Sequence, residues 1–227
     1  MYFRSRVEAG KQIATKLTYL KGSDCAIVAL SDGAVVVSAQ IAAVLHCVIT
    51  MLMAEGINAP GEPDAVASID QDGGYTYNSM YSSGQIEDFN MEYRQTFEQQ
   101  KLDKLSGMHR LIGLRGLIRR DLLRNKVVII VSDGLGSGYS LDAVGAYLKS
   151  TKVAKLVIVT PIASINAVDR MHILADEICC LGVTENFMGS NHYYEDNRLP
   201  PHETVIDTIQ SVVDQWQLPA KLAHARR

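Results

Sequence analysis

Long apolar runs, repeats and strong net charge are all missing from this sequence. No stretch reaches the roughly 18 apolar residues of a membrane-spanning helix, and no signal-peptide pattern is visible, so we expect neither a membrane span nor export. The formal net charge is only −3, and 47% of the 227 residues are hydrophobic. A chain of this composition can bury a substantial core, which excludes a disordered or fibrous protein. We predict a single cytoplasmic domain over residues 1–227.

Metal-binding and disulfide patterns are also missing. The four cysteines form no C-x-x-C pair, and the six histidines lack the i, i+3 or i, i+4 grouping of a helical metal site. We therefore predict no metal ligands and reduced cysteines packed in the core. Cys179 and Cys180 lie in an apolar run that is typical of a buried strand. The cysteines are Cys25, Cys47, Cys179 and Cys180.

Apolar runs typical of strands alternate with helical patterns along most of the chain. Such alternation favours the α/β class: a doubly wound parallel sheet flanked by helices. A turn-rich loop at 58–63 and a second turn at 72–74, between short β-like stretches, indicate a small hairpin insertion. Ligands of such sheets bind at the carboxyl ends of the strands. The predicted helices are 3–20, 35–45, 86–105, 141–149, 165–174 and 205–216, and the predicted strands are 24–30, 47–50, 126–131, 156–160 and 177–181.

A glycine-rich turn follows the apolar strand 126–131 and opens the helix 141–149. Its glycines let the backbone approach a ligand, its serines can donate hydroxyl hydrogen bonds, and Asp133 can accept them from a sugar. Glycine-rich turns at this position also serve packing alone, and that alternative stays open. The candidate phosphate- and ribose-binding residues are Ser132, Asp133, Gly134, Gly136, Ser137, Gly138, Tyr139 and Ser140.

Positive charge is concentrated between Lys101 and Lys126. This segment holds eight Lys and Arg against two Asp, a net charge of +6 in a chain whose total is −3. A solvated helix face and a surface for an anion or a partner both fit this pattern. We do not expect nucleic-acid binding, because the chain is mildly acidic overall and no aromatic residues are interleaved with the basic ones.

Residues 127–140, VVIIVSDGLGSGYS, resemble the phosphoribosyl-pyrophosphate motif of type I phosphoribosyltransferases, in which apolar residues precede two acids and a phosphate loop. The resemblance covers almost the whole chain and is to a branch of predicted bacterial phosphoribosyltransferases. Other segments similar to that branch are FRSRVEAG at 3–10, APGEPD at 59–64, VTPIA at 159–163 and YYED at 193–196.

The resemblance implies Mg²⁺-assisted transfer at the anomeric carbon of phosphoribosyl pyrophosphate, on a parallel sheet whose hood, roughly residues 55–110, selects the nucleophile. It implies that Asp133 is the catalytic residue that holds the ribose hydroxyls, and that Gly136 to Ser140 cradle the 5′-phosphate. A pyrophosphate loop would consist of Ser31, Asp32, Gly33 and Ala34. Homodimers are common in the family, so we expect one here.

Three positions depart from the family pattern. Ser132 replaces the first of the two acids, Asp32 stands where the family has Arg or Lys, and Glu55-Gly56 replaces a basic pair. A neutral hydroxyl is a weaker partner for ribose than a carboxylate. Repulsion between like charges a few ångströms apart costs on the order of several kcal/mol at low effective dielectric, so we expect pyrophosphate to bind more than about tenfold more weakly.

Three functions follow from these patterns. The domain binds a phosphorylated ribose or a nucleotide at the 133–140 loop, with its transferase activity lost or reduced. Alternatively, it is an active Mg²⁺-dependent phosphoribosyltransferase, or a structural or partner-binding protein. No motif marks the acceptor base.

Overall fold

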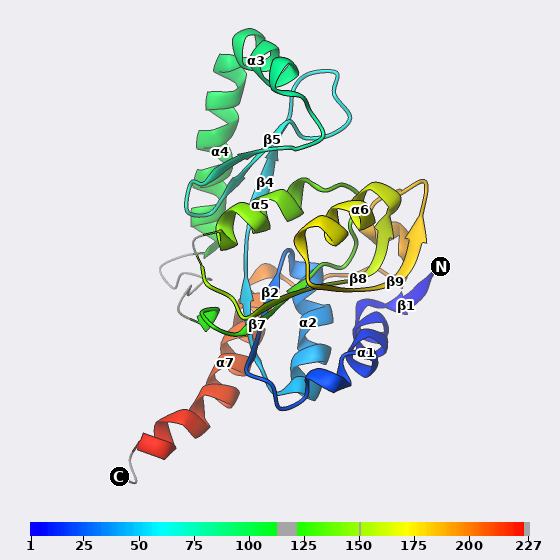
Figure 1. Cartoon of the computed structure of the whole chain (residues 1–227), viewed down its shortest axis with the longest axis vertical. Coiled ribbons are helices and arrows are strands. Elements are labelled where there is room, and N and C mark those ends of the chain that lie inside the picture. The colour runs from blue at the N-terminus through cyan, green and yellow to red at the C-terminus, as the bar shows by residue number, and fades with distance from the viewer. Residues whose placement is uncertain (113–121, 150, 225–227) are drawn as a thin grey trace.

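The centre of the molecule is a five-stranded parallel sheet (Figure 1). The computed structural model describes residues 1–112, 122–149 and 151–224, apart from the side chains of 111, 112, 139 and 215–224. All neighbouring strands of this sheet run parallel, in the order β3-β2-β7-β8-β9. The strands are β2 (Cys25–Ala29), β3 (Val48–Met51), β7 (Val127–Val131), β8 (Lys155–Ser164) and β9 (Glu177–Thr184).

Helices cover both faces of this sheet. Ile27 and Ile129 belong to one buried cluster, whereas the neighbouring Val28 and Ile130 belong to a second cluster, because alternate residues of a strand point to opposite faces. This arrangement explains the continuous apolar runs and confirms the predicted doubly wound α/β fold. The first cluster includes residues of α1 (Arg6–Lys16), α2 (Asp32–Leu45) and α7 (His202–His224), and the second includes residues of α5 (Tyr139–Leu148) and α6 (Ile165–Leu174).

The strand order reverses between β2 and β7. From β2 the chain passes to β3 on one side, whereas from β7 it passes to β8 and β9 on the other. The loops that follow β2 and β7 therefore separate at their carboxyl ends and leave a crevice, which is the usual ligand position in open α/β sheets.

The insertion forms a separate layer above α5 in Figure 1. It contains the antiparallel sheet β4 (Ala54–Ile57), β5 (Ala67–Asp70) and β6 (Tyr75–Tyr77), followed by α3 (Ser83–Glu92) and α4 (Arg94–Ile112). All three strands contact α5. We call residues 54–112 the hood.

The prediction of one helix over 86–105 is wrong, because α3 ends at Glu92 and α4 begins at Arg94. No proline or glycine marks this break in the sequence. Tertiary packing decides it: Phe89 in α3 meets Tyr81 edge to face and packs against the same core cluster that buries Phe97 of α4.

Two short strands from distant parts of the sequence lie side by side. β1 (Phe3–Ser5) pairs in parallel with β10 (Tyr194–Asp196), so the predicted helix over 3–20 is wrong for its first three residues. It is also wrong for its end, because α1 stops at Lys16. Short 3-10 helices also lie at Thr18–Leu20 and Ser190–Tyr193. Within the described ranges, no helix is both long and apolar enough to cross a membrane.

All four cysteines are free, as predicted. Cys25 and Cys47 are buried, whereas Cys179 and Cys180 are partly buried and pack against the core clusters, so the prediction of a buried strand at this pair holds only in part. The reason is that β9 is an edge strand of the sheet. Within the basic segment, Arg115, Arg119 and Arg120 lie outside the described residues, and Arg110 and Arg124 are exposed.

Candidate functional site

A cleft of about 680 Å³ opens at the carboxyl ends of β2, β3 and β7. It lies where the strand order reverses, so the fold itself creates the hollow. The cleft brings together the predicted Ser31 to Gly33 and Asp133. Its lining residues are Arg6, Leu30, Ser31, Asp32, Gly33, Met51, Met53, Ala54, Glu55, Asp133, Met188, Gly189, Ser190, Asn191, Leu199 and His202.

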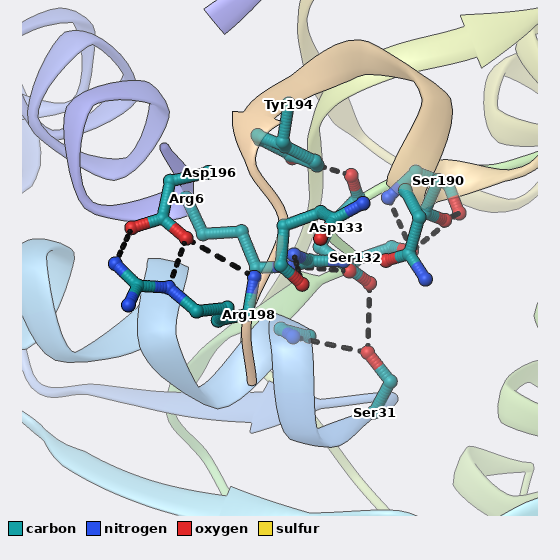
Figure 2. Close-up of polar contacts among 12 residues, drawn as sticks. Arg6, Ser31, Ser132, Asp133, Ser190, Tyr194, Asp196 and Arg198 are labelled. Carbon is teal, nitrogen blue, oxygen red and sulfur yellow. Dashed lines mark hydrogen bonds and ion pairs between the residues drawn. The ribbon is translucent and has the colours of Figure 1, made fainter. Parts of the chain in front are cut away.

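Asp133 is held by three partners (Figure 2). Ser31 Oγ donates to Oδ1 over 2.8 Å, and Arg6 Nε donates to Oδ2 over 2.8 Å. The Tyr194 hydroxyl donates to the Asp133 carbonyl over 2.6 Å. Burial and the nearby Asp133 raise the pKa of Tyr194, which keeps this donor protonated. With 6% of Asp133 exposed, both carboxylate oxygens are engaged within the protein.

Arg6 is the counter-ion of this buried carboxylate and is itself only 3% exposed. One terminal nitrogen donates to Asn191 Oδ1 over 2.5 Å and the other to the Asn197 carbonyl over 3.2 Å. The guanidinium carbon lies 4.5 Å from the centre of the Tyr194 ring. Two buried charges are tolerated because they are paired and hydrogen-bonded.

Sequence reasoning missed Arg6, Asn191 and Tyr194 as site residues. The segments 3–10 and 193–196 stand out in the sequence only for their resemblance to the family. Pairing of β1 with β10, which aligns Phe3 with Tyr194, brings both segments to Asp133.

The predicted pyrophosphate loop forms the start of α2. Ser31 is the N-cap, and its Oγ accepts a hydrogen bond from the Ala34 N–H over 3.0 Å. A Cβ on Gly33 would overlap Asp133 Oδ2 and would lie 2.6 Å from Arg6 Nε, so only glycine fits this close approach. Ala34 is fully buried.

Both acids that were expected to oppose pyrophosphate line the cleft. Asp32 Oδ1 lies 2.8 Å from Nδ1 of His202, at the start of α7. Glu55 lies at the hood edge, 3.9 Å from Lys104 Nζ. His202 is a further residue that the sequence did not mark, since a single histidine 170 residues from its partner has no local signal.

The glycine-rich turn packs closely against Phe187 and Ser190. A Cβ on Gly134 would lie 2.6 Å from Ser190 Oγ, and one on Gly136 would lie 2.6 Å from the Phe187 ring. Ser132 Oγ donates to the Gly134 carbonyl and accepts from the Gly134 N–H, so it stabilises the turn locally. Of the predicted phosphate-loop residues with described side chains, Gly136, Ser137, Gly138 and Ser140 do not line the cleft.

The first turn of α5 has no side-chain cap. Serine side chains cap α1, α2, α3 and α6, whereas α5 follows Gly138 without a side-chain cap. The N–H groups of Gly136, Ser137 and Gly138 make no hydrogen bond to another described residue. These unpaired donors at the positive end of a helix dipole are suited to an anion. Ser140 is partly exposed in the first turn, and the Tyr139 side chain lies outside the described residues.

A second hollow, of about 340 Å³, borders Gly138 between α5, α6 and the hood. Beside it, Asp142 in the first turn of α5 is 5% exposed and joins α5 to both α6 and the hood. Its Oδ2 accepts from the Ser79 N–H and Oγ over 3.1 and 2.9 Å, and its Oδ1 pairs with Arg170 of α6.

We predict that Asp142→Ala destabilises the protein by about 1–2 kcal/mol, because it removes a buried carboxylate that accepts from the exposed Ser79 and pairs with the partly buried Arg170. Urea unfolding would measure this loss, and faster amide exchange at Ser79 would locate it. Asp169→Ala is the matched control, because Asp169 lines the same hollow but is exposed. Equal stability of the two variants would contradict the prediction.

Comparison with known proteins shows the family and the fold of this chain. A sequence model of the phosphoribosyl transferase domain family matches residues 6–195. Two curated proteins of Mycobacterium tuberculosis, from strains CDC 1551 and H37Rv, are each 26% identical over 195 residues, and each is named "Putative phosphoribosyl transferase". The match covers 86% of this chain but 43% of those proteins, so the chain spans less than half the length of these relatives.

A solved structure has the same fold. The crystal structure of the protein TT1426 from Thermus thermophilus aligns with a TM-score of 0.69 and 23% identity, covering 95% of this chain and 99% of that one. The doubly wound sheet, with its cleft at the strand reversal and a hood above α5, is that of a type I phosphoribosyltransferase-like protein. The chain belongs to the phosphoribosyl transferase domain family.

Proposed function

We propose that this domain binds a phosphorylated ribose or a nucleotide at the 133–140 loop, and that its transferase activity is lost or reduced. One contrast in the site carries the proposal. The backbone donors of Gly136 to Gly138 have no described partner, whereas the Asp133 carboxylate is already bonded to Arg6 and Ser31. Donors for a phosphate are therefore available, and the acceptor for ribose hydroxyls is engaged.

The charges of the cleft support the loss of transfer chemistry. Among the described residues, Asp32, Glu55 and Asp133 line it, against the guanidinium of Arg6 and the ring of His202. A pyrophosphate group would meet an excess of like charge, which weakens its binding.

The same residues do not form a resident Mg²⁺ site. Magnesium prefers carboxylate oxygens that are free to coordinate it. Here the Ser132 hydroxyl is bonded within its own turn, and both oxygens of Asp133 already have protein partners. We propose that any Mg²⁺ involved arrives bound to phosphoribosyl pyrophosphate and belongs to that ligand.

Isothermal titration of the purified protein tests the proposal. We expect ribose 5-phosphate and AMP to bind, and phosphoribosyl pyrophosphate with Mg²⁺ to bind at least about tenfold more weakly than expected for an intact pyrophosphate site. Gly138→Pro is a useful variant, because it removes one loop N–H and should weaken binding of both monophosphates.

The outcomes separate the candidate functions. Tight binding of the diphosphate together with release of pyrophosphate in the presence of bases would favour the active Mg²⁺-dependent transferase. Absence of binding by all three ligands would overturn the proposal, and pull-down of a homodimer or another partner would then be the relevant measurement.

A further inference from the structure

We propose that Cys25 and Cys47 form a redox modification site, in which a peroxide joins the two thiols in a disulfide between the amino ends of β2 and β3. The inference goes beyond the proposed function, because the pair lies at the opposite ends of these strands from the cleft and uses no residue of the 133–140 loop.

The pairing of two parallel strands places these cysteines side by side. Ala26 of β2 pairs with Val48 of β3, and Cys25 and Cys47 come one residue earlier on each side. Neighbouring strands lie about 4.8 Å apart, and the Cα atoms of a disulfide are separated by about 4.4–6.8 Å. The two thiols also share a hydrogen bond. The backbone therefore needs little movement to allow a bond between them.

The shared hydrogen bond makes the two thiols unequal. Donation from Cys47 lowers the pKa of Cys25, whereas the same bond, together with burial, raises the pKa of Cys47. Asp24 raises and Lys126 lowers the pKa of Cys25, but these two charges are paired with each other over 2.9 Å. Since the thiolate is the nucleophile in cysteine chemistry, Cys25 attacks first and Cys47 supplies the second thiol.

The oxidation uses hydrogen peroxide as the electron acceptor. The Cys25 thiolate attacks one oxygen, the O–O bond breaks, and the leaving hydroxide takes up a proton to become water, which leaves a sulfenic acid on Cys25. The Cys47 sulfur then attacks the Cys25 sulfur, the thiol proton and the sulfenic hydroxyl leave as a second water, and the S–S bond forms. The two thiols thus lose two electrons, and one peroxide becomes two waters.

Both cysteines are buried just below the surface. Cys25 and Cys47 are 4% and 3% exposed, yet each directly follows an exposed residue, Asp24 and His46 respectively. Strand ends open more readily than the middle of a sheet. Local opening at this end therefore admits peroxide without unfolding of the core.

The other two cysteines provide an internal comparison. Cys179 packs against one core cluster and Cys180 against the other, so they point to opposite faces of β9 and cannot bond to each other while the strand is intact. Burial raises the pKa of both thiols. They are more exposed than Cys25 and Cys47, so exposure alone predicts that they react first. The proposal predicts the reverse order.

The test treats the full chain with hydrogen peroxide, blocks the remaining thiols with iodoacetamide after unfolding, and measures the mass. We expect a product that has lost two hydrogen atoms, carries two blocked thiols instead of four, and returns to the reduced mass with dithiothreitol. No Lys or Arg lies between Cys25 and Cys47, so chymotrypsin is used to separate them. A cross-linked peptide that contains both residues locates the bond.

Single substitutions test the two roles. In Cys47→Ala the second thiol is missing, so the sulfenic acid of Cys25 should accumulate and react with dimedone. In Cys25→Ala the oxidation of Cys47 should be at least about tenfold slower than in wild type. Cys179→Ala is the matched control and should form the disulfide at the wild-type rate. Far-UV circular dichroism, recorded throughout, checks that the fold persists.

The wild-type result decides the inference even where a variant does not fold. Three results would overturn it: no cross-linked peptide of Cys25 and Cys47, a cross-link that forms only after the circular dichroism signal is lost, or reaction of Cys179 or Cys180 before this pair.

Discussion

Replacing Gly33 with alanine is expected to destabilise the protein by about 3–5 kcal/mol, because the added methyl group disrupts a buried ion pair as well as close packing. The new Cβ would lie 2.6 Å from Arg6 Nε and 2.7 Å from Asp133 Cγ. Neither neighbour can move easily, since both are almost fully buried and Asp133 is also bonded to Ser31. Urea unfolding would measure the change.

Gly107→Ala is the matched control for this variant. Gly107 also lies in a helix, but a Cβ there meets no atom within 4 Å. Because alanine restricts the unfolded chain more than glycine does, this variant should be more stable than wild type by about 0.5–1 kcal/mol. If both variants shift stability in the same direction, the close approach at Gly33 does not have the importance that we assign to it.

Arg6→Ala is expected to cost a similar amount, about 3–5 kcal/mol, because it leaves the Asp133 carboxylate buried without its counter-ion. The substitution also removes the donors to Asn191 and to the Asn197 carbonyl, so the segment that carries β10 should lose protection. Urea unfolding gives the total effect, and amide exchange across residues 191–197 tests its location.

Arg198→Ala provides the comparison for Arg6. Arg198 also pairs with an aspartate, over 2.8 Å, but its side chain is 87% exposed. The bond from Arg198 lowers the pKa of Asp196 to about 2, yet solvent screens exposed pairs of this kind. This variant should unfold at the same urea concentration as wild type, and an equal loss in both variants would argue against a special role of the buried pair.

The parallel sheet was predictable because its signals are local. The run VVIIV predicts a strand over 126–131, and β7 spans Val127–Val131, since a strand buried on both faces needs apolar side chains throughout. Ser31 and the glycine-rich turn follow β2 and β7 directly, so parallel pairing was sufficient to bring Ser31 and Asp133 to one edge of the sheet.

Other features had no local signal. The break at Tyr93 depends on where Phe89 and Phe97 pack, and nothing in the sequence around it ends a helix. The Phe187 ring packs over Gly136, and these two residues are also distant in the sequence. The interpretation of Asp133 as the ribose ligand stays a prediction, although the structure pairs its carboxylate with Arg6.

By itself, the sequence determined the alternation of strands and helices, the position of the glycine-rich turn and the three departures from the family motif, because each depends on residues that are neighbours in the chain. Only the tertiary structure decided the electrostatics of the site. Arg6 reaches Asp133 across 127 positions, and Asp32 meets His202 across 170. The Arg6–Asp133 pair forms because a charge that is buried away from water needs a partner, and the fold brings the two side chains within reach of each other.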